Sequence, residues 1–537
     1  MTEGTGGSGG RAKIALRAAI VGAGTIASRI LGALRDSTMA AFLSADATDA
    51  FVVAFTIPNA LRQILGEGAA SAGVVPVFAQ VREQHGLDAA RAFYGKLRAA
   101  MVLVLVVVTV AGVLAAPWLV YVYSPGYASV PGKLELTGEL TRIVFPYIFF
   151  MGMAAMGAGA LQAVGKFAVP SFAPALLNVS MIVAPFAFGG LALWMGLPLV
   201  GAFAIAALVG GFLQLAVQWP ALRSAGLAGG FRLDLADPHV RRAASLMAPL
   251  LLGMAVYQLN LALSRLLASY LPTGSQSYLY YGSRVVEIPQ GVFALAIGTA
   301  ALPSLSALHA RGEIDELKKT FAFALRLSMF VALPATVAIA VLAEPIVVAL
   351  FARGEFGRAM VVETTRSLLF QASAVWVVSA IRQVLPLFYA AKDTKTPVAA
   401  SAASLVVYLA VGLALMGPMG HAGLALAVSV SVLAQLGFLL LGARRRLGAL
   451  GLRAVFGSVA RQLVASCAMA AAAWGIARLG RWEQGGHATN VLVLAAAVVA
   501  GAIVYLVVGL AVRVPEIEEL RAAVRARRAR RDARTPG

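Results

Sequence analysis

The feature that most constrains this chain is a series of apolar runs, each about 20 residues long and bounded by charges or by Gly and Pro. About fourteen runs can be counted, and an apolar helix of that length crosses the hydrocarbon core of a bilayer. Of the 537 residues, 60% are hydrophobic and 13% are charged, which is more apolar surface than a soluble domain can bury. The sequence therefore predicts an all-α polytopic membrane protein with about 14 transmembrane helices. The runs centre near residues 24, 65, 108, 150, 180, 208, 255, 292, 332, 375, 407, 432, 467 and 501.

The distribution of Lys and Arg predicts how these helices are oriented. Cations gather in every second loop, and cytoplasmic loops are the ones that carry an excess of Lys and Arg. The first run has no short apolar core followed by a cleavage site, so it is read as a retained helix. We expect a multi-pass protein of the cytoplasmic (inner) membrane with both termini in the cytoplasm. The cation-rich loops include Arg91, Lys166, Arg223, Arg241, Lys318, Lys392 and Arg444.

An internal repeat predicts two lobes. Leu97-Arg98 recurs as Leu325-Arg326, an offset of 228 residues that also relates Pro117 to Pro345 and Gly126 to Gly354. A repeat of about six spans places both copies in the same orientation, related by an axis along the membrane normal. The predicted parts are a cytoplasmic segment (1–13), an N-lobe (14–220), a C-lobe (221–443), two further spans (444–512) and a basic cytoplasmic tail (513–537).

The second and eighth spans are interrupted by Gly and Pro. Each interior proline removes one helix hydrogen bond and bends the helix. In transporters built from repeats, such interruptions at corresponding places in the two halves indicate the binding site. We therefore predict hinges at Pro58, Gly68, Pro289 and Gly291.

Four arginines, Arg29, Arg35, Arg62 and Arg284, lie in or at the ends of these apolar segments. An arginine at the centre of a membrane helix costs roughly 2.5 to 3.5 kcal/mol on insertion scales. One explanation is purely structural, because Arg29 and Asp36, seven apart, and Arg284 and Glu287, three apart, share helix faces. The other is an anionic ligand, which Arg35 and Arg62 favour because they have fewer candidate partners.

Arginine suits a phosphate because its planar fork donates paired hydrogen bonds and keeps its charge. The four arginines are therefore predicted to bind substrate. The predicted charge partners are Asp36, Asp49, Glu67 and Glu287.

The remaining chemistry is sparse. The five histidines show no metal-ligand spacing, and the single cysteine, Cys467, excludes an intramolecular disulfide. There is no phosphate-binding P-loop, and the net charge of +20 is spread over loops without a nucleic-acid-binding module. We expect a protein that is not an enzyme, with no catalytic residue, metal, cofactor or nucleic-acid partner. Its energy would come from the membrane potential or an ion gradient.

Several segments together resemble the MurJ/MviN family of lipid II flippases. They are Ser28 to Asp36, Thr48 to Phe51, Ile57 to Arg62, Glu67 to Ala69, Phe172 to Asn178, Tyr280 to Arg284, Gly298 to Pro303 and Lys392 to Pro397. The resemblance implies the two-lobe fold of the MOP exporter superfamily, with two extra helices that form a groove for a polyprenyl tail. It also implies a central cationic cavity, in which the four arginines and Asp36, Asp49 and Glu67 match the family's functional positions. The chain departs from the pattern at Thr56, Gln63 and Ser283.

The function predicted in this way is translocation of the lipid-linked peptidoglycan precursor lipid II to the outer leaflet, by alternating access, for cell wall synthesis. A flippase for another polyprenyl-diphosphate-linked glycan and a non-transporting scaffold of the envelope machinery are the alternatives. A multidrug exporter is disfavoured, because cationic drugs require an acidic cavity. The expected partners are the precursor and membrane lipids, with cell wall synthesis proteins left open.

Overall fold

The computed structural model describes residues 6–64, 74–290, 295–519 and 521–522, and in these ranges the chain forms helices and no strand. The predicted all-α class is therefore confirmed. The chain divides into two compact units, Met1–Gln276 and Ser277–Gly537. The division falls at the start of α12 (Ser275–Pro289). The lobe boundary after residue 220, which was drawn from the repeat, remains a prediction.

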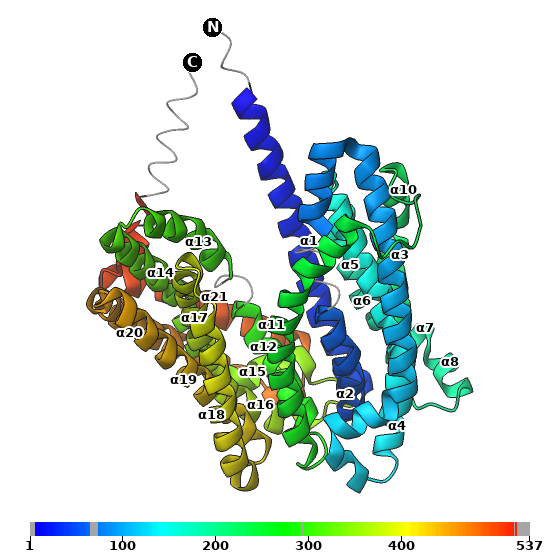
Figure 1. Cartoon of the computed structure of the whole chain (residues 1–537). Helices are drawn as coiled ribbons and strands as arrows, with labels where there is room; N and C mark the ends of the chain where they lie inside the picture. The colour runs from blue at the N-terminus through cyan, green and yellow to red at the C-terminus, as the bar shows by residue number, and fades with distance from the viewer. Residues whose placement is uncertain (1–5, 65–73, 291–294, 520, 523–537) are drawn as a thin grey trace, which may run out of the picture. The chain divides into compact units, whose positions relative to one another are not determined.

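The first unit is built around long helices (Figure 1). Its helices are α1 (Gly6–Phe42), α2 (Ala45–Arg62), α3 (Val75–Tyr123), η3 (Pro125–Ser129), α4 (Lys133–Val144), α5 (Tyr147–Ala163), α6 (Ala168–Ile182), α7 (Ala184–Ala187), α8 (Gly189–Trp194), α9 (Val200–Ala216), α10 (Trp219–Ser224) and α11 (Pro238–Ser269). Within α3, Gly86 has a non-helical backbone (φ 84°, ψ 177°), so a short helix and a long one meet there.

The second unit contains α12 and the helices that follow it. They are α13 (Leu295–Ala310), α14 (Ile314–Val341), α15 (Ala343–Phe351), α16 (Arg358–Ala372), α17 (Ala374–Ala390), α18 (Lys395–Met419), α19 (His421–Leu447), α20 (Leu452–Ala477), η5 (Trp482–Gln484) and α21 (Ala488–Ala511).

In the described part of the chain, nine helical segments are long and apolar enough to cross a membrane. They coincide with the spans predicted near 108, 150, 208, 332, 375, 407, 432, 467 and 501. Of the five other predicted spans, those near 24, 65 and 292 contain the arginines and the interrupted helices, and those near 180 and 255 fall in α6 and α11. Charge and interruption therefore set these segments apart from the uniformly apolar spans.

Helix α1 packs closely along α6 in the first unit (Figure 1). The contact depends on Gly24, where a Cβ atom would lie 2.4 Å from the backbone oxygen of Ser171. Only a glycine allows the two backbones to approach this closely. The segment with Arg29 and Arg35 is thereby held against α6.

The last two membrane helices, α20 and α21, pack on each other through residues repeated every fourth position, most of them Ala or Gly. On α21, Ala497, Gly501 and Tyr505 are buried, and they face buried Ala465, Met469, Ala473 and Ala477 of α20. Spacing of four residues keeps these side chains on one face of a helix and lets the backbones come close. Tyr505 also donates a hydrogen bond to the backbone oxygen of Phe330 on α14, 2.8 Å away. This bond connects the pair of helices to α14 within the second unit.

Candidate functional site

Arg35 is held at the junction of α1 and α6. Its Nε and Nη2 donate to Asp36 Oδ1 at 3.0 and 2.8 Å, and its Nη1 donates to Asn178 Oδ1 at 3.1 Å. The Asn178 amide nitrogen in turn donates to the backbone oxygen of Ser28 at 3.0 Å. Asn178 therefore connects two places on α1, and it orients Arg35 without neutralising it.

Arg29 lies two turns before Asp36 but does not pair with it. Asp36 turns to the adjacent Arg35, whereas Arg29 is exposed and makes no ion pair with any side chain of the described residues. The helix face that Arg29 and Asp36 share is not used for an ion pair, because two N–H groups of the adjacent Arg35 already donate to Asp36 Oδ1. Of Arg29 and Arg35, only Arg35 has its charge balanced in this way.

Arg62 lies in the last turn of α2 and lines a cavity of about 280 Å³ inside the first unit. Its Nε donates to Asn59 Oδ1 at 2.9 Å, a contact to a neutral amide. The wall includes small side chains of α5 and the polar side chains Gln162, Gln214 and Gln218. The cavity therefore combines a guanidinium with amides inside an otherwise apolar helix bundle.

Asp49, which the sequence assigned to the arginines, has a different cation as its neighbour. Lys133 Nζ of α4 lies 2.9 Å from Asp49 Oδ2 and 2.7 Å from Asp46 Oδ1, and the backbone N–H of Gly274 donates to Asp49 Oδ2 at 2.7 Å. The Lys133 ammonium also lies 4.6 Å from the centre of the Tyr127 ring. Because Lys133 and Asp49 are both buried, their charges balance each other in place.

Arg284 and Glu287 lie on α12 in the second unit. Arg284 Nη1 is 2.7 Å from Glu287 Oε2, and the guanidinium carbon is 4.7 Å from the centre of the Tyr280 ring. The Arg284 side chain remains 36% exposed, so a ligand has access to it. Each of the two units therefore contains at least one of the predicted arginines in an ordered setting.

The predicted hinges lie partly in the described residues. Pro58 is buried inside α2, and Pro289 is the last residue of α12. Directly after it, the backbone oxygen of Gln290 accepts a hydrogen bond of 2.6 Å from Arg382 Nη1 on α17. The predicted hinge residues Gly68 and Gly291, together with Glu67, lie outside the described residues.

The side chains at the three positions that depart from the family pattern each make a hydrogen bond. Thr56 donates to the backbone oxygen of Val52 at 2.6 Å, and Ser283 donates to that of Tyr280 at 2.7 Å. Gln63 accepts a hydrogen bond of 2.9 Å from Gln258 on α11. At position 63 an amide contact between α2 and α11 therefore stands where a further charge was expected.

Sequence reasoning missed four residues that shape the site: Asn59, Lys133, Asn178 and Arg382. Asn178 belonged to a segment that carried the resemblance, and that was the available signal. Lys133 appeared to be a loop cation, and Arg382 is one charge within a predicted span. Their partners are distant in sequence, so only the packing of helices brings them together.

The fold, with its long apolar helices and arginine-bearing helices, defines a polytopic helical membrane protein. A solved MATE-family transporter of the MOP superfamily in an inward-facing conformation matches with a TM-score of 0.64 at 16% identity, over 79% of this chain and 95% of its own. A solved structure titled lipid II flippase MurJ, inward closed conformation, matches with a TM-score of 0.71 at 21% identity, over 91% of this chain and 97% of its own. Both likenesses concern the fold.

The family model described as lipid II flippase MurJ matches residues 39–495. A probable lipid II flippase MurJ of Vibrio cholerae is 33% identical over 514 residues, covering 94% of this chain and 97% of the relative. The lipid II flippase MurJ of Burkholderia cenocepacia is 34% identical over 427 residues, covering 79% and 82%. The chain belongs to the lipid II flippase MurJ family, and it is a multi-pass membrane transporter and not an enzyme.

Proposed function

We propose that this chain translocates lipid II, the lipid-linked precursor of peptidoglycan, from the inner to the outer leaflet of the cytoplasmic membrane. The observation that carries the proposal is the setting of Arg35 and Arg62 in a chain related to lipid II flippases over most of its length. Asn178 and Asp36 together orient Arg35, Arg62 donates to Asn59 at the wall of a cavity in the first unit, and Asp49 is balanced by Lys133. Guanidiniums held among apolar helices favour an anionic substrate such as a diphosphate, because they keep their charge and donate paired hydrogen bonds.

In the proposed mechanism, Arg29, Arg35, Arg62 and Arg284 bind the diphosphate and its headgroup while the polyprenyl tail stays in lipid. Alternating access requires the helices that carry these residues to bend. Pro58 in α2 and Pro289 at the end of α12 are suited to this, because each removes a helix hydrogen bond beside an arginine-bearing turn. Gly68 and Gly291 are proposed to act with them.

The orientation and the energy source belong to the same proposal. With both termini in the cytoplasm, the cation-rich loops face inward, as Lys and Arg distributions require. An inside-negative potential of about 100 mV favours outward movement of each net negative charge by roughly 2.3 kcal/mol. Single-cysteine labelling in a Cys467→Ser background, with probes placed in the loops, measures the orientation directly.

The direct experiment measures flipping of fluorescent lipid II by purified protein in vesicles, with and without an imposed potential. Arg35→Ala and Arg284→Ala are expected to abolish flipping while the proteins remain folded. Arg242→Ala is the control, because Arg242 is an exposed arginine of α11 outside the proposed site. Undiminished flipping by both site variants would refute the assigned roles. Faster flipping of another polyprenyl-diphosphate-linked glycan in the same vesicles would refute the assignment of lipid II as the substrate.

A further inference from the structure

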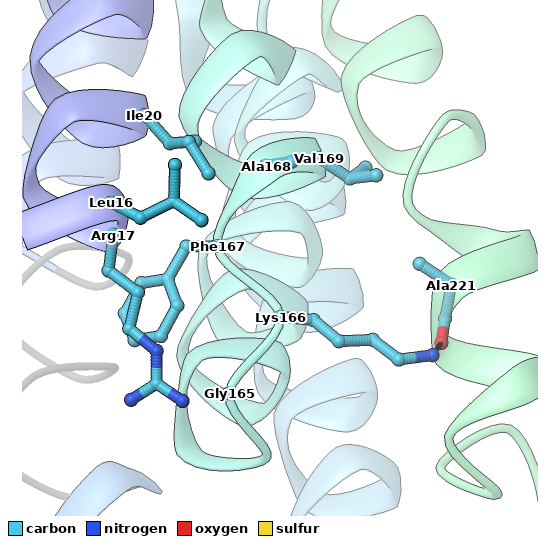
Figure 2. Close-up of a pocket in the computed structure, with 9 residues that line it drawn as sticks. All are labelled: Leu16, Arg17, Ile20, Gly165, Lys166, Phe167, Ala168, Val169 and Ala221. Atoms are coloured by element: carbon cyan, nitrogen blue, oxygen red, sulfur yellow. Dashed lines mark hydrogen bonds between the residues drawn. The ribbon is translucent and has the colours of Figure 1, made fainter. Parts of the chain in front are cut away.

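A second cavity, of about 420 Å³, lies in the first unit where the start of α1, the turn between α5 and α6, and α10 meet (Figure 2). Most of its wall is apolar, and two cations, Arg17 and Lys166, lie on it. The apolar lining residues are Leu16, Ile20, Phe167, Ala168, Val169 and Ala221. The cavity is separate from the one lined by Arg62, because the two have no residue in common.

Arg17 is oriented by contacts that leave its charge available. Its guanidinium carbon lies 5.1 Å from the centre of the Phe167 ring, and Figure 2 shows the two side chains next to each other. A Cβ atom on Gly165 would approach Arg17 Nη2 to 3.3 Å, so the guanidinium also borders the backbone of that turn. Among the described residues, no carboxylate pairs with Arg17. Stacking on a ring fixes the direction of a guanidinium while its N–H donors stay free for an anion.

Lys166 is positioned on the other side of the same turn, as Figure 2 shows. Its Nζ donates to Ser224 Oγ at 2.6 Å and to the backbone oxygen of Ala221 at 3.3 Å. These neutral partners fix the ammonium and do not cancel its charge. No ion pair of Lys166 occurs within the ranges that the structure describes.

We propose that this cavity binds an anionic phospholipid of the bilayer, with the phosphate near Arg17 and Lys166 and an acyl chain along the apolar wall. Basic pockets between membrane helices recognise lipid headgroups in this way. The volume suits a headgroup and part of one chain, and Leu16 is 63% exposed at the edge, so the wall continues toward lipid. Arg17 precedes Arg29 by twelve residues on α1, roughly 18 Å along the helix, which separates this site from the proposed substrate site.

Native mass spectrometry of the purified full-length protein tests the proposal. The probes are phosphatidylglycerol, phosphatidylcholine and a polyprenyl diphosphate, each titrated into detergent-solubilised protein. We expect phosphatidylglycerol to bind about tenfold more tightly than phosphatidylcholine, because two cations contribute to headgroup attraction. Arg17→Gln combined with Lys166→Gln should remove this preference.

The matched control is Arg232→Gln with Arg242→Gln, which removes the same charge from exposed positions of the first unit outside the cavity. The control should keep the preference for phosphatidylglycerol. Phe167→Leu keeps both charges but removes the ring, and it should weaken phosphatidylglycerol binding. If the double variant does not fold, this variant tests the site in its place. The proposal would be overturned if the control variant lost the preference for phosphatidylglycerol as fully as the double variant, or if the unmodified protein bound both phospholipids equally. Displacement of phosphatidylglycerol by equimolar polyprenyl diphosphate would also overturn it.

Discussion

Asn178 of α6 accepts a hydrogen bond of 3.1 Å from Arg35 of α1, although 143 residues separate them in the chain. The same amide donates to the backbone of Ser28, one residue before Arg29. One neutral side chain of α6 therefore orients the Arg35 guanidinium together with Asp36. It also fixes the part of α1 from which a second arginine projects.

The first prediction concerns this amide. Asn178→Ala should lower the rate of lipid II flipping by about ten- to a hundredfold, because a hydrogen bond to a charged group contributes about 1.5 to 3 kcal/mol. Arg35 keeps its charge in this variant, so the loss measures positioning. Flipping in vesicles is the measurement, and Asn178→Asp should bind substrate less tightly because it adds a second carboxylate beside Arg35. Unchanged flipping rates in both variants would show that Asn178 makes packing contacts but does not orient Arg35 for substrate binding.

The second prediction concerns the buried ion pair of Lys133 and Asp49. Lys133→Met leaves two aspartates, one of them fully buried, without their cation and should reduce stability by about 3 to 5 kcal/mol. Thermal unfolding in detergent measures the loss. Adding Asp49→Asn should restore a large part of it, because the uncompensated charge is removed. If the double variant is no more stable than the single one, the pair does not act as a unit.

The third prediction uses two glycines on one helix. Gly24→Ala places a Cβ atom 2.4 Å from the Ser171 oxygen, so α1 must move away from α6. We expect a loss of about 1 to 3 kcal/mol, as for overpacked cores, together with reduced flipping. Gly22→Ala is the control, because nothing lies within 4 Å of the added atom. Equal melting temperatures for the two variants would contradict the close contact.

The fourth prediction concerns pH and the turn between α17 and α18. Burial raises the pKa of the Asp393 carboxyl, but hydrogen bonds from the Thr396 side chain and from the backbone N–H groups of Thr396 and Lys395, with the charge of Arg446, outweigh it. The pKa therefore lies below its ordinary value. Because the folded pKa is depressed, the stabilisation is complete above the unfolded pKa of about 3.9 and is lost as the pH falls through the folded value.

Hydrogen exchange of residues 391–396, measured from about pH 6 down to pH 3, should show opening of this turn only at the acid end. Asp393→Asn should exchange faster at all of these pH values and show less pH dependence. An identical pH profile in the variant would assign the opening to other groups.

Much of the fold follows from the sequence alone, because a bilayer accepts few solutions. Backbone polar groups in hydrocarbon must bond within a helix, so a series of apolar runs already specifies an all-α polytopic protein. The nine uniformly apolar segments coincide with predicted spans for this reason. The pair of Arg284 and Glu287 was also foreseen, since residues three apart on a helix are neighbours whatever surrounds them.

Contacts between distant helices were decided only by the tertiary structure. Helical spacing offered Asp36 to Arg29, but the carboxylate bonds to Arg35, which Asn178 of α6 holds from the other side. Likewise, Asp49 faces Lys133 because α2 and α4 pack together, which no local pattern encodes.

The sequence determined that charges would lie among apolar helices, since burial is read from composition and periodicity. Which charge meets which depends on packing and close approach between helices, as at Gly24, and these exist only once the chain is folded.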